Sequence, residues 1–216
     1  MLLPLSLTVQ HPTVLTAHAA SRSTTVLCRG CTFEAGRKVV SSPFALSASV
    51  SEWFAEDEAL RILLSAADSA TPKGDGLWEI STSLPFPGAI MRSVNVMRVE
   101  RPTSESFSLS VVDAKTTVDS GPEWVAKLME AIDSTSKTVS TNRVTVERHG
   151  ADSAVAVSDI KLSVTMKLPG WLLLPVGPME RAGSQSLQGV LDQQIAPVLE
   201  RWRKGYLAWA ASKTST

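Results

Sequence analysis

Histidine and cysteine are scarce in this 216-residue sequence, which contains three histidines and two cysteines. His11 and His18 lie among the first 33 residues, and His149 stands alone in the remainder of the chain. A Ser-His-Asp triad or a zinc site needs several such side chains within reach of one another. We therefore expect no histidine-based catalysis, no metal site and no cofactor.

Other chemical signatures are also missing. Gly74 and Gly76 form a Gly-x-Gly pair, but no third glycine and no strand-to-helix context accompany them, so a phosphate-binding loop is not expected. Asp113, Asp119 and Asp159 are scattered singly, and no pair of carboxylates indicates acid–base catalysis. We expect a protein that is not an enzyme.

The sequence also has no excess of charge of one sign and no long apolar run. The 21 Lys and Arg residues are balanced by 21 Asp and Glu residues, and no basic cluster with interleaved aromatics occurs. Nucleic-acid binding depends on clustered positive charge and is not expected. No apolar run approaches the ~20 residues that a helix needs to cross a bilayer, so we expect no transmembrane segment. With 44% hydrophobic residues, the chain can form the core of one domain.

The first 33 residues contain no Asp or Glu and many Ser and Thr residues. This composition is typical of an organelle transit peptide, and an ordinary disordered N-terminus is the alternative. Val26-Leu27-Cys28 resembles a plastid processing site, and cleavage there leaves a chain that begins near Arg29 or later. Cys28 and Cys31 have the C-x-x-C spacing of a redox or metal pair, but no second pair accompanies them and we assign them no chemistry.

These features divide the chain into three parts. We expect residues 1–38 to be a transit peptide and disordered lead, residues 39–211 to be the folded domain, and residues 212–216 to be a frayed tail. The composition of the first part indicates a chloroplast or another plastid.

Alternating apolar and polar residues predict strands over residues 44–50, 77–84, 89–101, 107–111, 142–147 and 154–168. Apolar residues at helical spacing, preceded by capping residues, predict helices over about residues 52–67 and over 123–132. The glycine-containing segment 68–76 is expected to be a loop.

The last third of the chain carries the clearest pattern and determines the expected architecture. From Ile160 to Leu168 apolar and polar residues alternate, which predicts a strand with one face in the core. After Met179 apolar residues recur at steps of three and four as far as Trp209, which predicts one long amphipathic helix. We expect an α+β fold, in which a curved antiparallel sheet of about six to seven strands grips this helix, with small helices after the first strand and in mid-chain.

Three segments resemble a known superfamily: Leu168-Pro169-Gly170-Trp171 after the last strand, Pro178-Met179-Glu180-Arg181-Ala182-Gly183 at the helix start, and Arg201-Trp202-Arg203-Lys204-Gly205-Tyr206-Leu207-Ala208-Trp209 at its end. With the order of elements, they make the chain similar to the START-like, helix-grip superfamily of SRPBCC type. More narrowly, residues 40–211 resemble a domain-of-unknown-function family of cyanobacteria and plastids. The helix over 123–132 departs from that family's pattern. It is either a lid or a surface insertion, and we favour the insertion.

The resemblance implies a hydrophobic cavity between sheet and helix, and a plastid setting in the stroma or on the thylakoid surface. The candidate lining residues are Trp78, Ile80, Met91, Met97, Val99, Leu162, Val164, Met166, Leu187, Leu191, Ile195 and Trp202. The same residues could instead interdigitate as an ordinary core. The first hypothesis is therefore a non-catalytic plastid protein that binds a hydrophobic small molecule, such as a membrane lipid or a pigment. A cyclase-like enzyme on the same fold is the least favoured alternative.

The second hypothesis is an accessory or assembly factor that docks on a thylakoid protein complex without a ligand. Its contact surface would contain Trp124, Leu128, Met129, Trp171 and Leu172. A closed cavity favours the first hypothesis, whereas a filled core with an exposed apolar patch favours the second.

Overall fold

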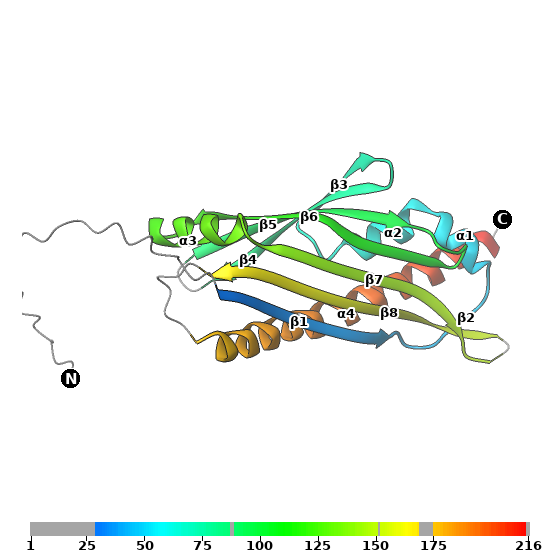
Figure 1. Ribbon diagram of the computed structural model, residues 1–216. Coiled ribbons are helices and arrows are strands. Elements are labelled where there is room, and N and C mark those ends of the chain that lie inside the picture. Colours follow the sequence, from blue (N-terminus) through cyan, green and yellow to red (C-terminus); the bar gives the residue numbers. More distant parts are fainter. Residues whose placement is uncertain (1–28, 87–88, 151, 169–174, 215–216) are drawn as a thin grey trace, which may run out of the picture.

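The fold is a curved antiparallel sheet with a long C-terminal helix, α4, packed against it (Figure 1). The computed structural model describes residues 29–86, 89–150, 152–168 and 175–214. Its elements are β1 (Arg29–Val40), β2 (Phe44–Ala45), α1 (Val50–Ala55), α2 (Asp57–Leu64), β3 (Ser69–Gly74), β4 (Leu77–Phe86), β5 (Ala89–Glu100), β6 (Ser106–Ser120), α3 (Glu123–Asp133), β7 (Lys137–Arg148), β8 (Ser153–Leu168) and α4 (Val176–Thr214). The predicted α+β class and helix-grip architecture are confirmed.

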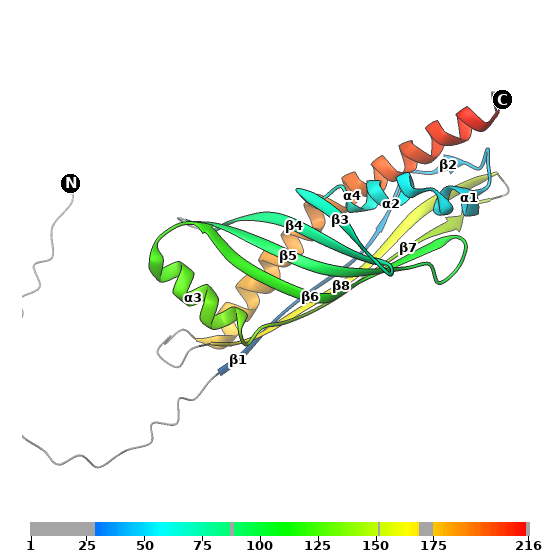
Figure 2. The same cartoon turned by 90° about the horizontal axis from the view of Figure 1, so that it is seen from above.

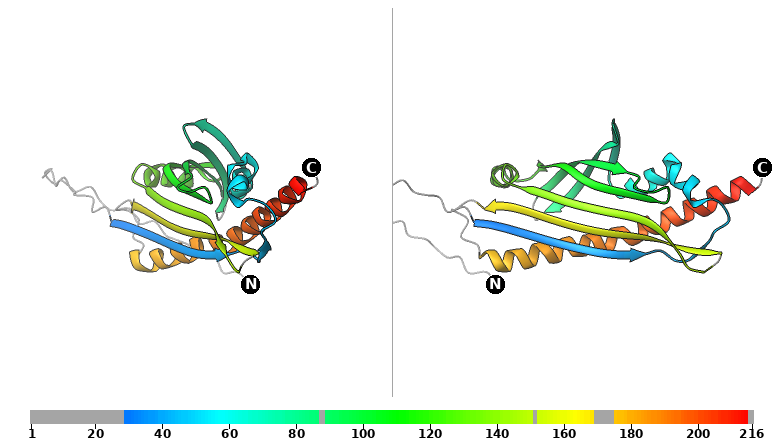
Figure 3. Two further views of the ribbon diagram at one scale, coloured as in Figure 1. Left: turned by 90° about the vertical axis from the view of Figure 1, so that its right-hand side faces the viewer. Right: turned by 45° about the vertical axis from the view of Figure 1, so that its right-hand side comes forward.

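The sheet has the strand order β1-β8-β7-β6-β5-β4-β3, and the short β2 also pairs with β8. Within the described residues it has eight strands, more than the sequence predicts. α1 and α2 lie near one end of the sheet and α3 lies at the other, while α4 runs between these ends (Figure 2). A side view shows the curvature of the sheet around α4 (Figure 3). The face toward α4 is called the inner face below.

The largest correction to the sequence analysis concerns β1. The expectation of a disordered lead is wrong for residues 29–38, because β1 pairs with β8 from Arg29 opposite Leu168 to Val40 opposite Val157. The expected domain boundary at residue 39 therefore falls inside a strand. Glycine and charged residues interrupt the apolar alternation of β1, so its own sequence pattern is weak. Cys31, assigned to the unstructured lead, is fully buried on this strand, whereas Cys28 lies outside the described residues.

Smaller corrections affect the elements near β1 and β3. The first strand predicted over 44–50 is reduced to β2, and helix α1 begins at Val50 with Ser49 as its N-cap. The loop predicted over 68–76 contains β3, whose residues are all exposed and so carry no core-facing pattern. Gly74, Asp75 and Gly76 all have positive φ, the geometry of the tight turn that leads into β4. At the other end of the chain, the tail expected from residue 212 is helical through Thr214.

The strands predicted over 142–147 and 154–168 are present as parts of β7 and β8, which pair as an antiparallel hairpin. His149 N donates to Ser153 O at 2.8 Å, and Gly150 has a φ of 100°, which a residue with a side chain rarely adopts. The predicted long helix and the mid-chain helix are also present, as α4 and α3.

Side chains of α4 cover the outer edge of β1. Three backbone N–H groups of β1 each donate to an α4 side chain: Thr32 N to Glu180 Oε1 (2.9 Å), Glu34 N to Ser184 Oγ (3.0 Å) and Gly36 N to Gln188 Oε1 (3.3 Å). The donors are two residues apart on the strand and the acceptors four residues apart on the helix. These separations are about 6.6 Å and about 6.0 Å, so strand and helix stay nearly in step. The N-terminal part of α4 thus occupies the place of a neighbouring strand, which protects this edge from pairing with another chain.

Close packing holds the same part of α4 against β1. Gly183 lies directly over the ring of Phe33, and a Cβ atom there would come within 2.5 Å of Phe33 Cδ1. Arg37 of β1 forms an ion pair with Asp192, one turn beyond Gln188. Glycine at position 183 therefore permits the approach that the three hydrogen bonds need.

Farther along α4, Glu200 binds the chain that follows β1. Its carboxylate accepts hydrogen bonds from Ser42 N at 2.5 Å and from Arg203 Nε at 2.8 Å. Burial acts to raise the pKa of Glu200, but the hydrogen bonds from Ser42 and Arg203, with the charge of Arg203, outweigh it and lower the pKa. The folded state therefore favours the ionised carboxylate.

This shift predicts a pH-dependent effect of Glu200→Gln. A group whose pKa is lower in the folded state stabilises the protein fully above its unfolded pKa, about 4.3, and loses that contribution as the pH falls through the folded pKa. We expect Glu200→Gln to lower the thermal unfolding midpoint at pH 7 and to have a much smaller effect at pH 3. Calorimetry of both proteins across this range measures the difference. Glu58→Gln, at an exposed position of α2, is the control, and an effect of Glu200→Gln that is equal at both pH values contradicts the assignment.

Candidate functional site

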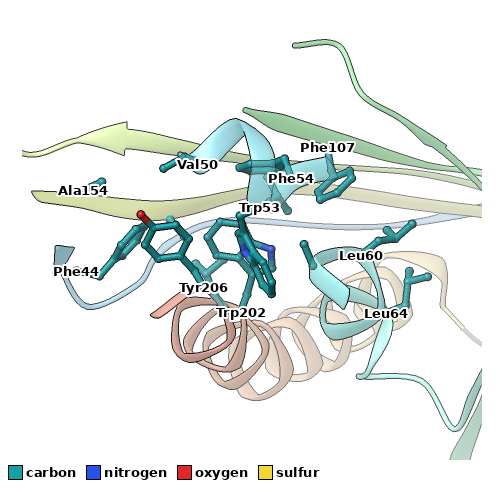
Figure 4. Close-up of a cluster of buried hydrophobic side chains, with 14 of the residues drawn as sticks. Phe44, Val50, Trp53, Phe54, Leu60, Leu64, Phe107, Ala154, Trp202 and Tyr206 are labelled. Carbon is teal, nitrogen blue, oxygen red and sulfur yellow. The ribbon is translucent and has the colours of Figure 1, made fainter. Parts of the chain in front are cut away.

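One half of the inner face is a filled aromatic core. Its largest side chains are those of Phe44, Trp53, Phe54, Phe107, Trp202 and Tyr206, all fully or almost fully buried. Figure 4 shows Trp53, Trp202 and Tyr206 gathered between α1, α4 and the sheet. The ring centroids of Trp53 and Trp202 are 6.0 Å apart with an edge-to-face tilt of 62°, a favourable aromatic geometry. We call this region the closed half.

Hydrogen bonds and packing leave little free volume in the closed half. Tyr206 Oη donates to Ala48 O at 2.7 Å, which ties the end of α4 to the segment before α1. A void between α2, α4, β7 and β8, lined in part by Asn142 and Ser158, has a volume of about 40 Å³. Ligand pockets in proteins usually measure about 300–1,000 Å³, so this void holds no lipid or pigment.

Half of the predicted cavity residues belong to this closed half. Ile80 and Trp202 are core members, and Trp78, Met97, Val99 and Ile195 pack against them. Leu191 of α4 is also buried. These side chains therefore form part of an ordinary core, which was the alternative left open in the sequence analysis.

The rest of the inner face, toward α3, is only half-buried, and we call it the open half. Its inward-facing residues are Thr82, Met91, Ser93, Asn95, Ala114, Thr116, Val118, Thr138, Ser140, Leu162, Val164 and Met166. The predicted residues Met91, Leu162, Val164 and Met166 are among them, and Leu187 of α4 is likewise half-buried. The structure therefore divides the predicted cavity lining between two regions with different solvent exposure.

The sequence analysis missed the polar members of the open half. Met91, Met97 and Val99 were predicted to line the cavity, and strict alternation along their strand puts Ser93 and Asn95 on the same face. Because alternation was used to find apolar faces, polar residues at inward positions were not considered as part of a site. Asn95 Nδ2 donates to Ser93 Oγ at 3.1 Å, so these two residues form a polar pair on the inner face.

α3 borders the open half at the place where β6 and β7 stop pairing. β6 and β7 pair only from Ser106 opposite Thr145 to Ser110 opposite Thr141, and α3 connects the parts of the two strands beyond these pairs. Asp133 of α3 accepts a hydrogen bond from Thr116 N at 2.9 Å. A groove of about 440 Å³ lies between α3 and β6, and its lining includes the open-half residues Thr116 and Val118. The outward-facing Lys115 and Thr117 line it too, so this groove of ligand size lies along the edge of β6, beside the open half.

The predicted docking surface is only partly described. Trp124 of α3 is 61% exposed, and Leu128 and Met129 on the same helix are half-buried. Trp171 and Leu172 lie outside the described residues. Val125 and Ile132 are buried, so α3 packs on the sheet through these two residues.

A second groove lies on the outer face of the sheet, opposite to the inner face. It has a volume of about 590 Å³ and is lined mainly by outward positions of β1, β7 and β8, among them Glu34, Val139 and Lys161. Gln188 closes its edge beside β1.

Metal-binding groups do not gather at either half of the described inner face. The described residues contain no group of three His, Cys, Asp or Glu side chains that could hold a metal ion. Burial, with a smaller effect from the Glu180 carboxylate, raises the pKa of the Cys31 thiol, which keeps it protonated and poorly nucleophilic. In the same described segments, no helix is both long and apolar enough to cross a bilayer.

Comparisons with known proteins identify similar folds only. No family model matches the chain, and no curated protein matches it. A conserved protein from Geobacillus kaustophilus is 10% identical, with 82% of this chain and 94% of that chain covered and a TM-score of 0.44. A START superfamily protein from Mycobacterium smegmatis is 11% identical over 78% and 97% of the two chains, with a TM-score of 0.41. The Zhui aromatase/cyclase from Streptomyces sp. R1128 is 9% identical over 81% and 93%, with a TM-score of 0.40.

At these identities and TM-scores the similarity carries no inference about function. The helix-grip assignment stands on the strand order and on the position of α4. The resemblance to a cyanobacterial and plastid family finds no matching family model and stays a prediction.

Proposed function

We propose that this protein binds an apolar small molecule, such as a lipid or a pigment, against the open half of the inner face. The observation that carries the proposal is the exposure of this face. Met91, Leu162, Val164 and Met166 point inward, yet the protein covers them only partly. A bound apolar molecule would remove this surface from water at about 25 cal/mol per Å², and the adjoining α3 groove has room for such a molecule.

The binding is proposed to be non-catalytic. The open half offers hydroxyl, amide, thioether and aliphatic side chains, none of which is a general acid or base near neutral pH. We propose a plastid setting as well, in the stroma or on the thylakoid surface, on the composition of the first 33 residues and the resemblance to the plastid family.

A second candidate function rests on the exposure of α3. Trp124 is 61% exposed beside the half-buried Leu128 and Met129, and Trp is enriched at protein interfaces. This surface would suit an accessory factor that docks on a protein complex of the thylakoid without a ligand.

Substitutions on β8 test the first proposal. Met166→Gln keeps the side-chain length and replaces an apolar group on the open half with an amide. We expect it to weaken binding of the neutral apolar probe N-phenyl-1-naphthylamine about tenfold, because ~1.4 kcal/mol of apolar burial is lost. Lys167→Gln, on the outer face of the same strand, should leave the affinity unchanged. Fluorescence titration measures both affinities.

Native mass spectrometry and organic extraction of the chain purified from its own source complete the test. A stoichiometric apolar molecule supports the proposal. A bare polypeptide that also binds no probe contradicts it and favours the docking surface on α3.

A further inference from the structure

We propose that the open half selects an uncharged amphiphile that carries hydroxyl or carbonyl groups, and that it rejects fatty acids and other anionic lipids. This inference rests on the proposed function and specifies the ligand class of the same site. It derives from the polar side chains on the inner face and from the positions of the charges around them.

The first observation is a row of three hydroxyl groups that crosses three strands. Thr82 of β4 is opposite Ser93 of β5, and Ser93 is opposite Thr116 of β6. Directly opposite residues of an antiparallel pair have Cβ atoms about 5 Å apart, so the row is continuous on the inner face. Asn95, one row away, adds an amide that donates to Ser93 Oγ.

The second observation is a matching polar edge on β7. Thr138 and Ser140 point inward there, opposite the apolar Val164 and Leu162 of β8. These two hydroxyls and the row that ends at Thr116 lie on either side of the separation between β6 and β7. The apolar side chains of β8 therefore adjoin polar groups, an arrangement that suits an amphiphile better than a pure hydrocarbon.

The third observation is that several of these hydroxyls are not used by the fold. Thr82, Thr138 and Ser140 make no side-chain hydrogen bond to any residue in the described segments, although all three are half-buried. A hydrocarbon that covered them would leave each one unpaired, at a cost of about 1–3 kcal/mol per group. A ligand hydroxyl or carbonyl avoids that cost because it can donate to or accept from them.

The fourth observation is that, among the described residues, no unpaired cation occupies an inward strand position of the open half. Arg92, Lys161 and Lys167 alternate onto the outer face. Arg37, at an inward position of β1, is paired with Asp192 of α4. A carboxylate or phosphate held against the open half would thus lack a partner, which makes its burial costly.

The charges nearest the open half are mainly negative. Asp133 accepts from Thr116 N, and Glu180 accepts from Thr32 N at the start of β1. The α3 groove has one basic residue in its lining, Lys115, against two acidic residues, Glu130 and Asp133. An anion would therefore meet repulsion in addition to its desolvation cost.

A matched probe series tests this selection. The probes are five pyrene-labelled chains of equal length that end in a hydroxyl, a methyl ester, a carboxylate, an amine or a methyl group. At pH 7.5 we expect the alcohol and the ester to bind the full-length protein at least tenfold more tightly than the carboxylate or the hydrocarbon. The affinity of the amine, which the nearby carboxylates attract, should fall between those of the alcohol and the carboxylate. Fluorescence titration gives all five affinities.

Thr82→Val and Ser140→Ala remove the unpaired hydroxyls with little change in shape. We expect each to weaken alcohol binding three- to tenfold and to leave hydrocarbon binding unchanged or tighter. Thr71→Val, at an exposed position of β3, is the matched control and should change neither affinity.

The outcomes separate this inference from the proposed function. If the carboxylate or the amine binds as tightly as the alcohol, or if Thr82→Val and Ser140→Ala leave the ratio of alcohol to hydrocarbon affinity unchanged, the selection is wrong while ligand binding stands. If none of the five probes binds, the proposed function itself fails, and the selection fails with it.

Discussion

Deletion of residues 1–40 is expected to abolish cooperative folding, whereas deletion of residues 1–28 should leave the sheet and its stability intact. The longer deletion removes all 12 residues of β1, which pair with β8 along their whole length. It also removes the N–H donors that bind Glu180, Ser184 and Gln188. The edge of β8 would then be unpaired, and such an edge promotes aggregation.

Circular dichroism and thermal unfolding of the two truncated chains measure this difference. The chain from residue 29 should unfold in one transition with the same midpoint as the full-length protein. A chain from residue 41 that remains soluble and unfolds cooperatively would show that β1 is an accessory strand.

Trp202→Ala is expected to lower the free energy of unfolding by about 3–5 kcal/mol, the usual cost of truncating a buried Trp. Trp202 is 0% exposed, and its ring centroid lies 5.1 Å from that of Phe54 and 6.0 Å from that of Trp53. Its Nε1 has no hydrogen-bond partner among the described residues, so the loss comes from packing and not from a broken polar contact. Since a domain of this kind is stable by about 5–15 kcal/mol, this single change removes a large fraction.

Trp124→Ala is the matched control for this substitution. Trp124 is 61% exposed, and surface substitutions usually change stability by less than about 0.5 kcal/mol. Urea denaturation of both variants gives the two free energies. Equal losses in the two variants would contradict the description of the closed half as a filled core.

Elements with a strong local pattern could be predicted from the sequence. β8 alternates from Ile160 to Leu168, and α4 carries apolar residues at helical spacing, so both were identified with the correct type. β1 and β3 could not, because neither has a clear apolar alternation of its own. The strand β1 depends on β8 and on α4 side chains, and β3 is exposed on both faces.

The candidate site shows the same limit. The candidate lining included Met91 and Val164, which lie on the inner face, but the sequence pattern could not distinguish the closed half from the open half. That division depends on where α1, α2 and the end of α4 cover the sheet, which is a tertiary property. The unpaired hydroxyls of Thr82 and Ser140 were missed because a polar residue at an inward position weakens the pattern used to find the face.

The contact between β1 and α4 also sets a limit on how long a helix can stand in for a strand. Two strand residues advance about 6.6 Å and four helix residues advance about 6.0 Å. Donor and acceptor positions therefore move out of register by about 0.6 Å with each successive hydrogen bond, which is called a rung here. Over this length the side chains absorb the difference, since the three bonds measure 2.9 Å, 3.0 Å and 3.3 Å. At the fourth rung Asp192 pairs with the side chain of Arg37. A straight helix can thus substitute for a β-neighbour over about three rungs, and a longer edge would need a bend in one partner or a change of acceptor.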